Sequence, residues 1–292
     1  MRRRARSWLA LPSLGLALAA PLAAQQYTFQ VFDFDSGLNN LAVESIYQDR
    51  EGFLWVGTQN GLFRYDGRGF TEFGKKEIYP GAFILSIHQT PEGTLWVGTT
   101  KGLYRGEHGR FVPVVLPASE QQRVNGKSGL ASDEEGRLYV ATRDGLAIGT
   151  RAGPREEWTF KLVSRGDGAR SADKGQAVAS VTVTRSGRVL FGCAMDLCEL
   201  DEKDQVRLAA AQPNPRHGPW SYIYEDARGD LYVRGAQCLE VLRKGSARFE
   251  PVTGPVDLRS PWVPQLGGDY DGRLLVPIYG GLAIVSQGRW QI

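Results

Sequence analysis

The chain has 292 residues, a formal net charge of +3, and 36 Gly, 15 Pro, 7 Trp, 11 Tyr and 12 Phe residues against two Met. Length alone leaves one or two domains open, but this composition is typical of many short strands joined by tight turns and favours an all-β fold. Four of the basic residues are arginines within the first six residues. Removing them turns the charge of +3 into −1, with acids and bases interspersed, which argues against a nucleic-acid-binding protein.

The N-terminal segment has the pattern of a secretory signal peptide. Its arginines precede an apolar run from Trp8 to Ala24 that ends in small residues. The run contains Pro12 and Pro21 and is shorter than the roughly 20 apolar residues of a membrane span, so an uncleaved anchor is the weaker alternative. We therefore expect residues 1–24 to be a signal peptide and residues 25–292 to form a periplasmic domain without a membrane span.

The cysteines and histidines indicate a disulfide and no metal site. In an oxidising compartment, Cys193 and Cys198 are the natural disulfide pair, which leaves Cys238 as a single thiol. The C-x4-C spacing has no second pair to complete a zinc site, and the three His are scattered without ligand spacing. We predict no metal and no cofactor.

A repeated segment is the main feature of the sequence. Two segments agree at most of their positions: GFLWVGTQNGL and GTLWVGTTKGL. Four weaker copies follow them, and the successive spacings between the six copies are 41, 43, 51, 42 and 43 residues. A period of this size is that of a propeller blade. The leading glycines of the six copies are Gly52, Gly93, Gly136, Gly187, Gly229 and Gly272.

Each copy predicts four strands. The core of the repeat is apolar on both faces, which predicts a strand packed between neighbouring sheets. Asp49 followed by Gly52 predicts a hairpin turn before this strand, and LFRY and FTEF predict the two strands after it. The predicted fold is an all-β propeller of four-stranded blades, with six repeat cores in a ring of six or seven blades. An aliphatic residue six positions before each leading Gly marks the inner strand: Ile46, Ile87, Leu130, Val181, Ile223 and Leu266.

The two ends of the repeat array do not match as one complete ring. Phe29 and Phe32 align with Phe70 and Phe73 at an offset of 41, which predicts the outer strand of a blade whose inner strands do not precede it. The last copy nevertheless begins an outer strand of its own at Trp290. We therefore expect the domain to be truncated at its C-terminus.

The first two copies resemble a known family. SIYQDREGFLWVGTQNGLFRYDG and IHQTPEGTLWVGTTKGLYRG are similar to the two-component regulator propeller repeat, whereas the last three copies depart from it at Cys193, Arg234 and Pro277. The resemblance implies a periplasmic sensor propeller of a hybrid histidine kinase or diguanylate cyclase, with an output domain that this chain lacks. Some members are thought to sense saccharides, and homodimer formation through the output module is a further expectation from the resemblance.

Candidate ligand-binding residues lie in two kinds of loop. Ligands of propellers usually meet the loops at the mouth of the central channel, which we expect to be the turns after the second strands and the connections into the inner strands. Trp220 and Trp262 are either a stacking platform or plugs of the channel, and Asn125 and Lys127 belong to the same connections. The predicted ligand-binding residues are Asn39, Asn60, Tyr79, Lys101, Arg143, Arg216, His217, Trp220 and Trp262.

Three functions compete on these observations. A propeller that senses a small molecule or saccharide is the first, and a non-catalytic interaction or envelope scaffold is the second. A propeller lyase or hydrolase is the third, in which His217 is a candidate acid–base residue. The sequence has no G-x-S-x-G elbow, no phosphate-binding loop and no acid pair distinct from the turn acids, so we predict that the chain is not an enzyme.

Overall fold

The computed structural model describes residues 30–117, 122–153, 156–164, 177–255, 257–258, 265–269, 271–286 and 289–292. The chain divides into two compact units, residues 1–32 and 33–292, and every described strand belongs to the second. The predicted signal peptide, most of the connection around Trp262 and the insertion before blade 4 lie outside the described residues. No described helix has the length and apolar character needed to cross a membrane.

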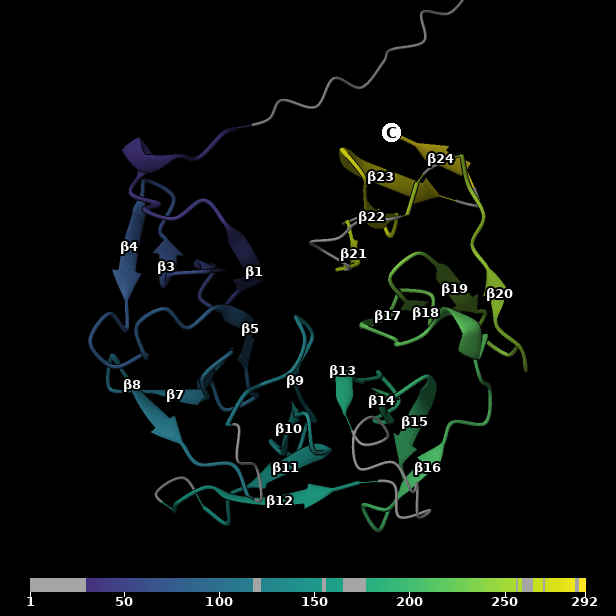
Figure 1. The fold of residues 1–292 in the computed structure, drawn as a ribbon, viewed down its shortest axis with the longest axis horizontal. Coiled ribbons are helices and arrows are strands. Elements are labelled where there is room, and N and C mark those ends of the chain that lie inside the picture. The colour runs from purple at the N-terminus through teal and green to yellow at the C-terminus, as the bar shows by residue number, and fades with distance from the viewer. Residues whose placement is uncertain are drawn as a thin grey trace, which may run out of the picture. The chain divides into compact units, whose positions relative to one another are not determined.

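The strands form six four-stranded antiparallel sheets, the blades, arranged in a ring (Figure 1). This confirms the predicted all-β propeller. Blades 1 to 3 contain β1 Val43–Gln48, β2 Leu54–Thr58, β3 Gly61–Tyr65, β4 Phe70–Phe73; β5 Ile84–Gln89, β6 Leu95–Thr99, β7 Leu103–Glu107, β8 Arg110–Val114; β9 Leu130–Ser132, β10 Leu138–Ala141, β11 Leu146–Thr150 and β12 Thr159–Val163. Blades 4 to 6 contain β13 Val178–Val183, β14 Val189–Cys193, β15 Asp196–Leu200, β16 Val206–Leu208; β17 Tyr222–Glu225, β18 Leu231–Arg234, β19 Leu239–Leu242, β20 Glu250–Pro251; β21 Gly267–Gly268, β22 Leu274–Ile278, β23 Gly281–Ser286 and β24 Arg289–Gln291.

The first turns of blades 1, 3, 5 and 6 have the predicted acid and glycine. In blade 1, Asp49 Oδ1 accepts hydrogen bonds from the backbone N–H groups of Glu51 and Phe53, at 3.1 and 2.8 Å. Gly52 has a φ of +90°, a left-handed conformation that glycine adopts without strain. The acid and the glycine therefore fix the hairpin that aligns β1 with β2.

Packing between blades forms the core. Five clusters of buried apolar side chains each join two consecutive blades, from blades 1 and 2 to blades 5 and 6. Trp55 and Leu62 of blade 1, for example, lie in one cluster with Ile87 and Val97 of blade 2. Because each sheet is apolar on both faces, it is stable only between two neighbours, which explains why the blades stack.

A glycine in the second strand of several blades makes room for the next blade. A Cβ atom on Gly57 would lie 2.6 Å from Ile84 Cγ2, and one on Gly98 would lie 2.7 Å from Val124 Cγ1. A Cβ on Gly192 would lie 2.4 Å from the carbonyl oxygen of Trp220. The connection into each following blade therefore crosses directly over these glycines.

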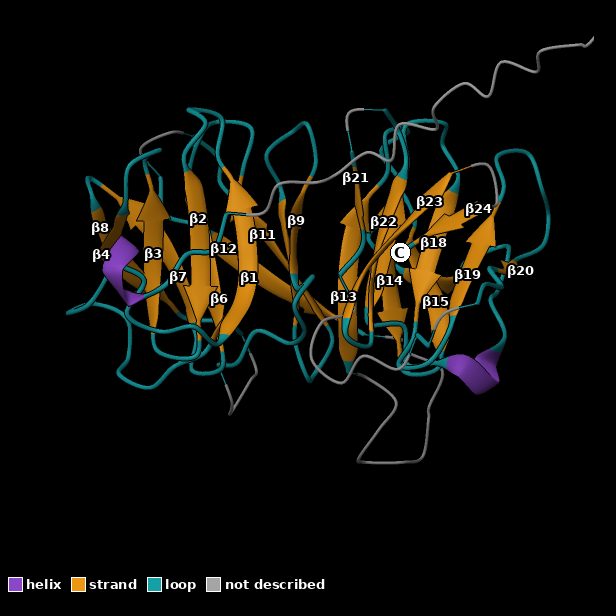
Figure 2. Cartoon of the chain, turned by 90° about the horizontal axis from the view of Figure 1, so that it is seen from above, coloured by secondary structure: helices purple, strands orange, loops and turns teal. Residues whose placement is uncertain are grey.

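Two short 3-10 helices lie outside the blades: η1 Phe34–Ser36 and η2 Pro215–His217. The helix η1 precedes β1, and Leu38 after it packs on Val56 and Phe63 of blade 1. The helix η2 lies in the connection that leads into blade 5 (Figure 2). The predicted disulfide is present in blade 4, where Cys193 and Cys198 are bonded with their Cα atoms 5.8 Å apart.

Candidate functional site

The propeller has two ends, which differ in the loops that form them. In Figure 2, β1 points toward the upper edge, so the turns after the first and third strands lie at that end, here called the first-turn end. The turns after the second strands and the connections between blades, including η2, lie at the opposite, second-turn end. The sequence-predicted ligand-binding residues that the structure describes belong to loops of the second-turn end.

The structure leaves most of the predicted residues apart. Seven of them are exposed and lie in six different turns and connections, with Arg216 and His217 sharing η2. The seven are Asn39, Asn60, Tyr79, Lys101, Arg143, Arg216 and His217. Lys101 and Tyr79 do approach each other, with Lys101 Nζ 6.0 Å from the centroid of the Tyr79 ring. Trp262 lies outside the described residues.

Trp220 is a core residue. Its side chain is fully buried among Leu190, Leu197 and Ile223, between blades 4 and 5. The indole Nε1 donates a hydrogen bond to the carbonyl oxygen of Met195 at 3.0 Å. The ring therefore packs between two blades, so Trp220 does not plug the channel and has no face available for stacking on a ligand.

A buried ion pair ties the second-turn end together. Lys127 Nζ lies 2.7 Å from Glu44 Oε2, and the two side chains are 17% and 10% exposed. Lys127 precedes blade 3 and Glu44 belongs to blade 1, so the pair reaches past blade 2. Asn125 Nδ2 donates to the carbonyl oxygen of Val178 in blade 4 at 2.7 Å. Asn125 and Lys127, which the sequence placed at a ligand-binding mouth, instead join three blades.

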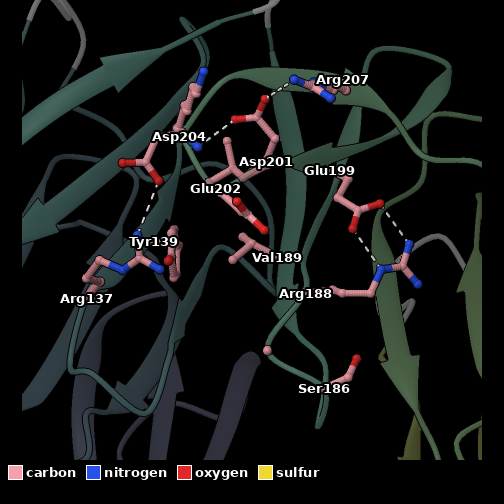
Figure 3. A pocket seen from close by; sticks show the side chains of 13 residues that line it. Arg137, Tyr139, Ser186, Arg188, Val189, Glu199, Asp201, Glu202, Asp204 and Arg207 are labelled. Atoms are coloured by element: carbon pink, nitrogen blue, oxygen red, sulfur yellow. Dashed lines mark hydrogen bonds and ion pairs between the residues drawn. The ribbon is translucent and has the colours of Figure 1, made fainter.

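The described cavities lie at the first-turn end. One of about 580 Å³ opens between blades 3 and 4 (Figure 3). Its charged residues are paired: Arg188 binds Glu199 through two hydrogen bonds of 2.7 and 2.8 Å, and Arg137 Nη1 lies 3.2 Å from Asp204 Oδ1. Arg207 forms a further ion pair at the rim. These pairs hold the two blades together and leave few cationic groups of this cavity free for a ligand.

A second cavity, here called the channel cavity, has a volume of about 560 Å³ and receives residues from blades 1 to 4. Groups from four blades meet only where the inner strands converge, which places it at the first-turn end of the central channel. Its size is within the roughly 300 to 1,000 Å³ of small-molecule sites. It is lined by Arg50, His88, Gln89, Pro91, residues 132–135, Arg137 and residues 183–187.

His88 is a neutral group in the channel cavity. Burial, and secondarily the charge of Arg50, lowers the pKa of His88 to about 4, so the imidazole is uncharged at neutral pH. Its Nε2 lies 2.8 Å from Ser132 Oγ. The ring also meets Tyr47 edge-on, with 6.0 Å between centroids. The ring therefore contributes hydrogen bonding to the wall without adding positive charge.

Two arginines occupy equivalent positions in the channel cavity. Arg50 and Arg185 are the second residues of the first turns of blades 1 and 4. Arg50 Nη1 donates to the carbonyl oxygen of Pro91, and Arg185 Nη1 donates to that of Ala227 at 2.8 Å. A guanidinium has five N–H groups in a planar fork, so each anchored head keeps further donors for an acceptor in the cavity.

Two buried polar residues of blade 5, Arg234 and Glu240, were not among the predicted site residues. Arg234 stands where blades 1, 2 and 4 have glycine, and it is 1% exposed. Its Nη2 donates to Leu258 O at 3.1 Å, but Nη1 has no partner among the described residues. Burial lowers the pKa of Arg234. Separately, His217 Nδ1 lies 2.7 Å from Glu240 Oε1, with the Glu240 side chain only 5% exposed. The buried carboxylate fixes the orientation of the His217 ring.

The described residues contain no group of three or more His, Cys, Asp or Glu side chains arranged to hold a metal ion. Cys238 is a free thiol whose Sγ lies 3.4 Å from the carbonyl oxygen of His217. Burial raises the pKa of Cys238, which keeps the thiol protonated and poorly nucleophilic at neutral pH.

Comparison with protein families gives two matches within the chain. Residues 37–60 and 78–101 match the family model for the two-component regulator propeller. The chain therefore carries two copies of the two-component regulator propeller repeat. Both matched segments start in the connection before a blade and end in the turn after its second strand, so each match covers the two inner strands of blade 1 or blade 2.

Solved structures share the fold of this propeller. One is the extracellular domain assigned to the hybrid two-component system BT3049 of B. thetaiotaomicron, with 20% identity and a TM-score of 0.69 over 90% of this chain and 36% of that chain. A second is virginiamycin B lyase from Staphylococcus aureus, with 14% identity and a TM-score of 0.64 over 87% of this chain and 85% of the lyase. A third is PorZ, a surface component of the type-IX secretion system of Porphyromonas gingivalis, with 16% identity and a TM-score of 0.62 over 85% of this chain and 38% of PorZ.

These likenesses establish the fold alone, because all three identities are low. The chain spans about a third of the length of the two-component domain that it matches. No curated protein matches the sequence. The three neighbours also differ in what their names say, since one is the extracellular domain of a hybrid two-component system, one a lyase and one a secretion component.

Proposed function

We propose that this propeller is the periplasmic, non-catalytic sensing module of a signal-transduction protein and that its ligand binds in the channel cavity. The family repeats in blades 1 and 2 support the sensor role. One structural observation supports the site: Arg50 and Arg185, from blades on different sides of the channel cavity, both line it with anchored guanidinium groups. Export by the signal peptide at residues 1–24 is part of the proposal.

The chemistry of the wall favours a small, oxygen-rich ligand. Arginine N–H groups bind hydroxyl, carboxylate and carbonyl oxygens, and the neutral His88 and Ser132 provide further hydrogen bonds. Asp133, Glu134 and Glu135 on the same wall can accept hydrogen bonds from sugar hydroxyls. An acidic or neutral oligosaccharide fits this donor and acceptor set, and the volume accommodates one or two sugar rings.

The test measures ligand-induced stabilisation with a panel of acidic and neutral oligosaccharides. A ligand that binds the folded state raises the melting temperature by mass action. We expect Arg50→Met and Arg185→Met to abolish the rise, and Arg143→Met, at the second-turn end, to leave it unchanged. Loss of the rise in Arg143→Met alone would move the site to the mouth predicted from the sequence. A folded protein that no saccharide stabilises would favour the scaffold function.

An enzymatic function is the second candidate, because the buried Glu240 orients His217 and leaves its ring 40% exposed. An imidazole held by a carboxylate is a common arrangement for a general base. Incubation with the same oligosaccharides, followed by mass spectrometry of the products, tests this function. Turnover that His217→Ala abolishes would support a lyase or hydrolase, whereas unchanged substrates at high protein concentration would reject it.

A further inference from the structure

A further cavity lies at the first-turn end, between blades 4 and 5, and is here called the blade 4/5 cavity. Its volume is about 490 Å³. The first turn of blade 4 forms one wall, and the first and third turns of blade 5 form the other. Residues 184–186 also line the channel cavity, so the first turn of blade 4 is a wall of both.

The lining of the blade 4/5 cavity is strongly cationic. Five of its residues are basic and only Glu225 is acidic, while the acid of the blade 5 turn, Asp226, does not line it. The cavity between blades 3 and 4, at the preceding interface, instead has four basic and four acidic residues (Figure 3). The positive charge is therefore specific to one interface. The five basic residues are Arg185, Arg188, Arg228, Arg243 and Lys244.

Three of these cations share one carboxylate. Asp230 Oδ2 accepts a hydrogen bond from Arg243 Nη1 at 2.7 Å, and Asp230 Oδ1 accepts one from the backbone N–H of Lys244 at 2.9 Å. Burial alone would raise the pKa of Asp230, but these hydrogen bonds and the charges of Arg243 and Arg228 lower it. The side chains of Arg228 and Lys244 form no ion pair within the part of the chain that the structure describes.

The other two cations leave the charge unbalanced as well. Arg188 is neutralised by Glu199. Arg185 donates through Nη1 to a carbonyl oxygen, and its backbone N–H donates to Glu225 Oε2 at 2.7 Å. The five cations therefore face three carboxylates, counting Asp230 and Glu199 behind the wall, and an excess of two positive charges remains.

The sequence of the repeat does not account for this charge. The residue before the leading Gly is acidic in four blades, but it is Ser186 in blade 4 and Arg228 in blade 5, and both line the cavity. The blade 5 turn nevertheless forms as in blade 1, because Asp226 Oδ1 accepts the backbone N–H groups of Arg228 and Asp230 at 2.9 Å. The turn therefore does not require a basic side chain at this position. The acidic equivalents are Glu51, Glu92, Glu135 and Asp271.

We infer that the blade 4/5 cavity binds a doubly charged phosphate group through Arg228, Arg243 and Lys244. The N–H groups of arginine and lysine match the oxygens of a phosphate. A phosphate monoester carries a charge of about −1.5 to −2 near neutral pH, which offsets the excess of two. The volume exceeds that of the bare anion and leaves room for an organic group attached to it. This site is separate from the ligand proposed for the channel cavity and does not depend on it.

The first experiment is isothermal titration calorimetry at constant ionic strength with inorganic phosphate, glucose 6-phosphate, glucose 6-sulfate and glucose. We expect both phosphates to bind and glucose not to bind. Glucose 6-sulfate has the same shape as the phosphate ester and one charge less, so its affinity should be at least about tenfold lower. Tighter binding of glucose 6-phosphate than of inorganic phosphate would identify an ester as the ligand, and the reverse order would identify the free ion.

The second experiment places the phosphate with variants. Arg228→Glu restores the residue of blades 1 to 3, and it should weaken phosphate binding by at least about tenfold, as should Lys244→Gln. Lys203→Glu makes the same charge change as Arg228→Glu in the balanced cavity between blades 3 and 4, and screening should limit its effect to less than about twofold. Arg50→Met should leave phosphate binding unchanged, because Arg50 lines only the channel cavity. Melting temperatures check that each variant is folded.

Three results would overturn the inference. One is that neither phosphate binds the folded protein at millimolar concentration. Another is that Lys203→Glu weakens binding as much as Arg228→Glu does, which would show attraction to general surface charge and no defined site. The third is that glucose 6-sulfate binds as tightly as glucose 6-phosphate, which would contradict a site for a doubly charged group.

Discussion

The indole N–H of Trp55 donates to the carboxylate of Asp49, with 2.7 Å between Nε1 and Oδ2. The same carboxylate accepts the backbone hydrogen bonds of the first turn, so one acid joins the turn to the core strand. Blade 3 repeats the arrangement, because Tyr139 donates to Asp133 Oδ2 at 2.8 Å. Blade 2 has Thr90 at the acidic position, and the buried Trp96 N–H has no acceptor among the described residues.

Thr90→Asp should therefore stabilise the protein. It gives the Trp96 N–H an acceptor in the geometry of blade 1, and satisfying a buried donor is worth about 1 to 2 kcal/mol in the free energy of unfolding. The reverse change, Asp49→Thr, leaves Trp55 without its acceptor and should destabilise by a similar amount. Chemical denaturation measures both, and a destabilising Thr90→Asp would show that the threonine is preferred for another reason.

The Lys127–Glu44 pair predicts a non-additive double variant. Lys127→Ile alone leaves the largely buried Glu44 carboxylate with the amide of Gln59 as its one remaining side-chain partner among the described residues, and we expect a loss of about 2 to 4 kcal/mol. Adding Glu44→Gln should recover much of that loss, because it removes the uncompensated charge. Lys101→Ile, an exposed lysine at the same end, is the control and should change little. Purely additive effects in a double-mutant cycle would contradict the coupling.

His88 predicts a pH-dependent stability. Its pKa is about 4 in the folded protein and near 6.5 in the unfolded chain, so the unfolded chain binds the proton first as the pH falls. The free energy of unfolding should fall between pH 6.5 and 4, by up to about 3 kcal/mol from this group, and then level off. His88→Gln should flatten the difference curve in this window. His108→Gln, at a side chain that is 94% exposed, should not.

Arg234 predicts a stabilising substitution. The buried guanidinium makes one hydrogen bond to Leu258 O, and no carboxylate compensates its charge among the described residues. Arg234→Met keeps much of the volume and removes the charge, which should raise the free energy of unfolding by about 1 to 3 kcal/mol. The exposed Arg143→Met should leave it unchanged. A lower denaturation midpoint for Arg234→Met would mean that the charge is compensated in solution.

The repeat made the blades predictable. Residue types at a constant offset of 41 to 43 residues located the inner strand, the core strand and the turn between them in most blades. Blade 6 is the weakest case, because its inner strand is reduced to Gly267–Gly268 and the predicted Leu266 lies just before it. Apolar alternation and turn chemistry are local, so a single sequence suffices to recognise them.

The candidate site was less predictable, because its contacts join residues distant in the chain. Lys127 and Glu44 lie 83 residues apart in blades that are not adjacent, and no local pattern pairs them. The burial of Trp220 could have been predicted, because it occupies the same position in its repeat as Ile84 and Val178, which are buried in other blades. The end of the channel that holds a cavity is decided by the packing of the long side chains that line the channel. The repeat pattern does not encode this packing.

The glycines under the connections have a consequence for how such a ring can change in evolution. Gly57 belongs to one repeat and Ile84, which lies over it, belongs to the next, so each fitted pair spans a repeat boundary. Consider a tandem duplication whose copied segment begins just before a connection. The copied segment carries a residue that covers the glycine of the preceding blade, and it also carries a glycine that the connection into the following blade can cover. Breaks elsewhere separate these partners, and the blade rather than the single strand is the unit by which the ring can lengthen.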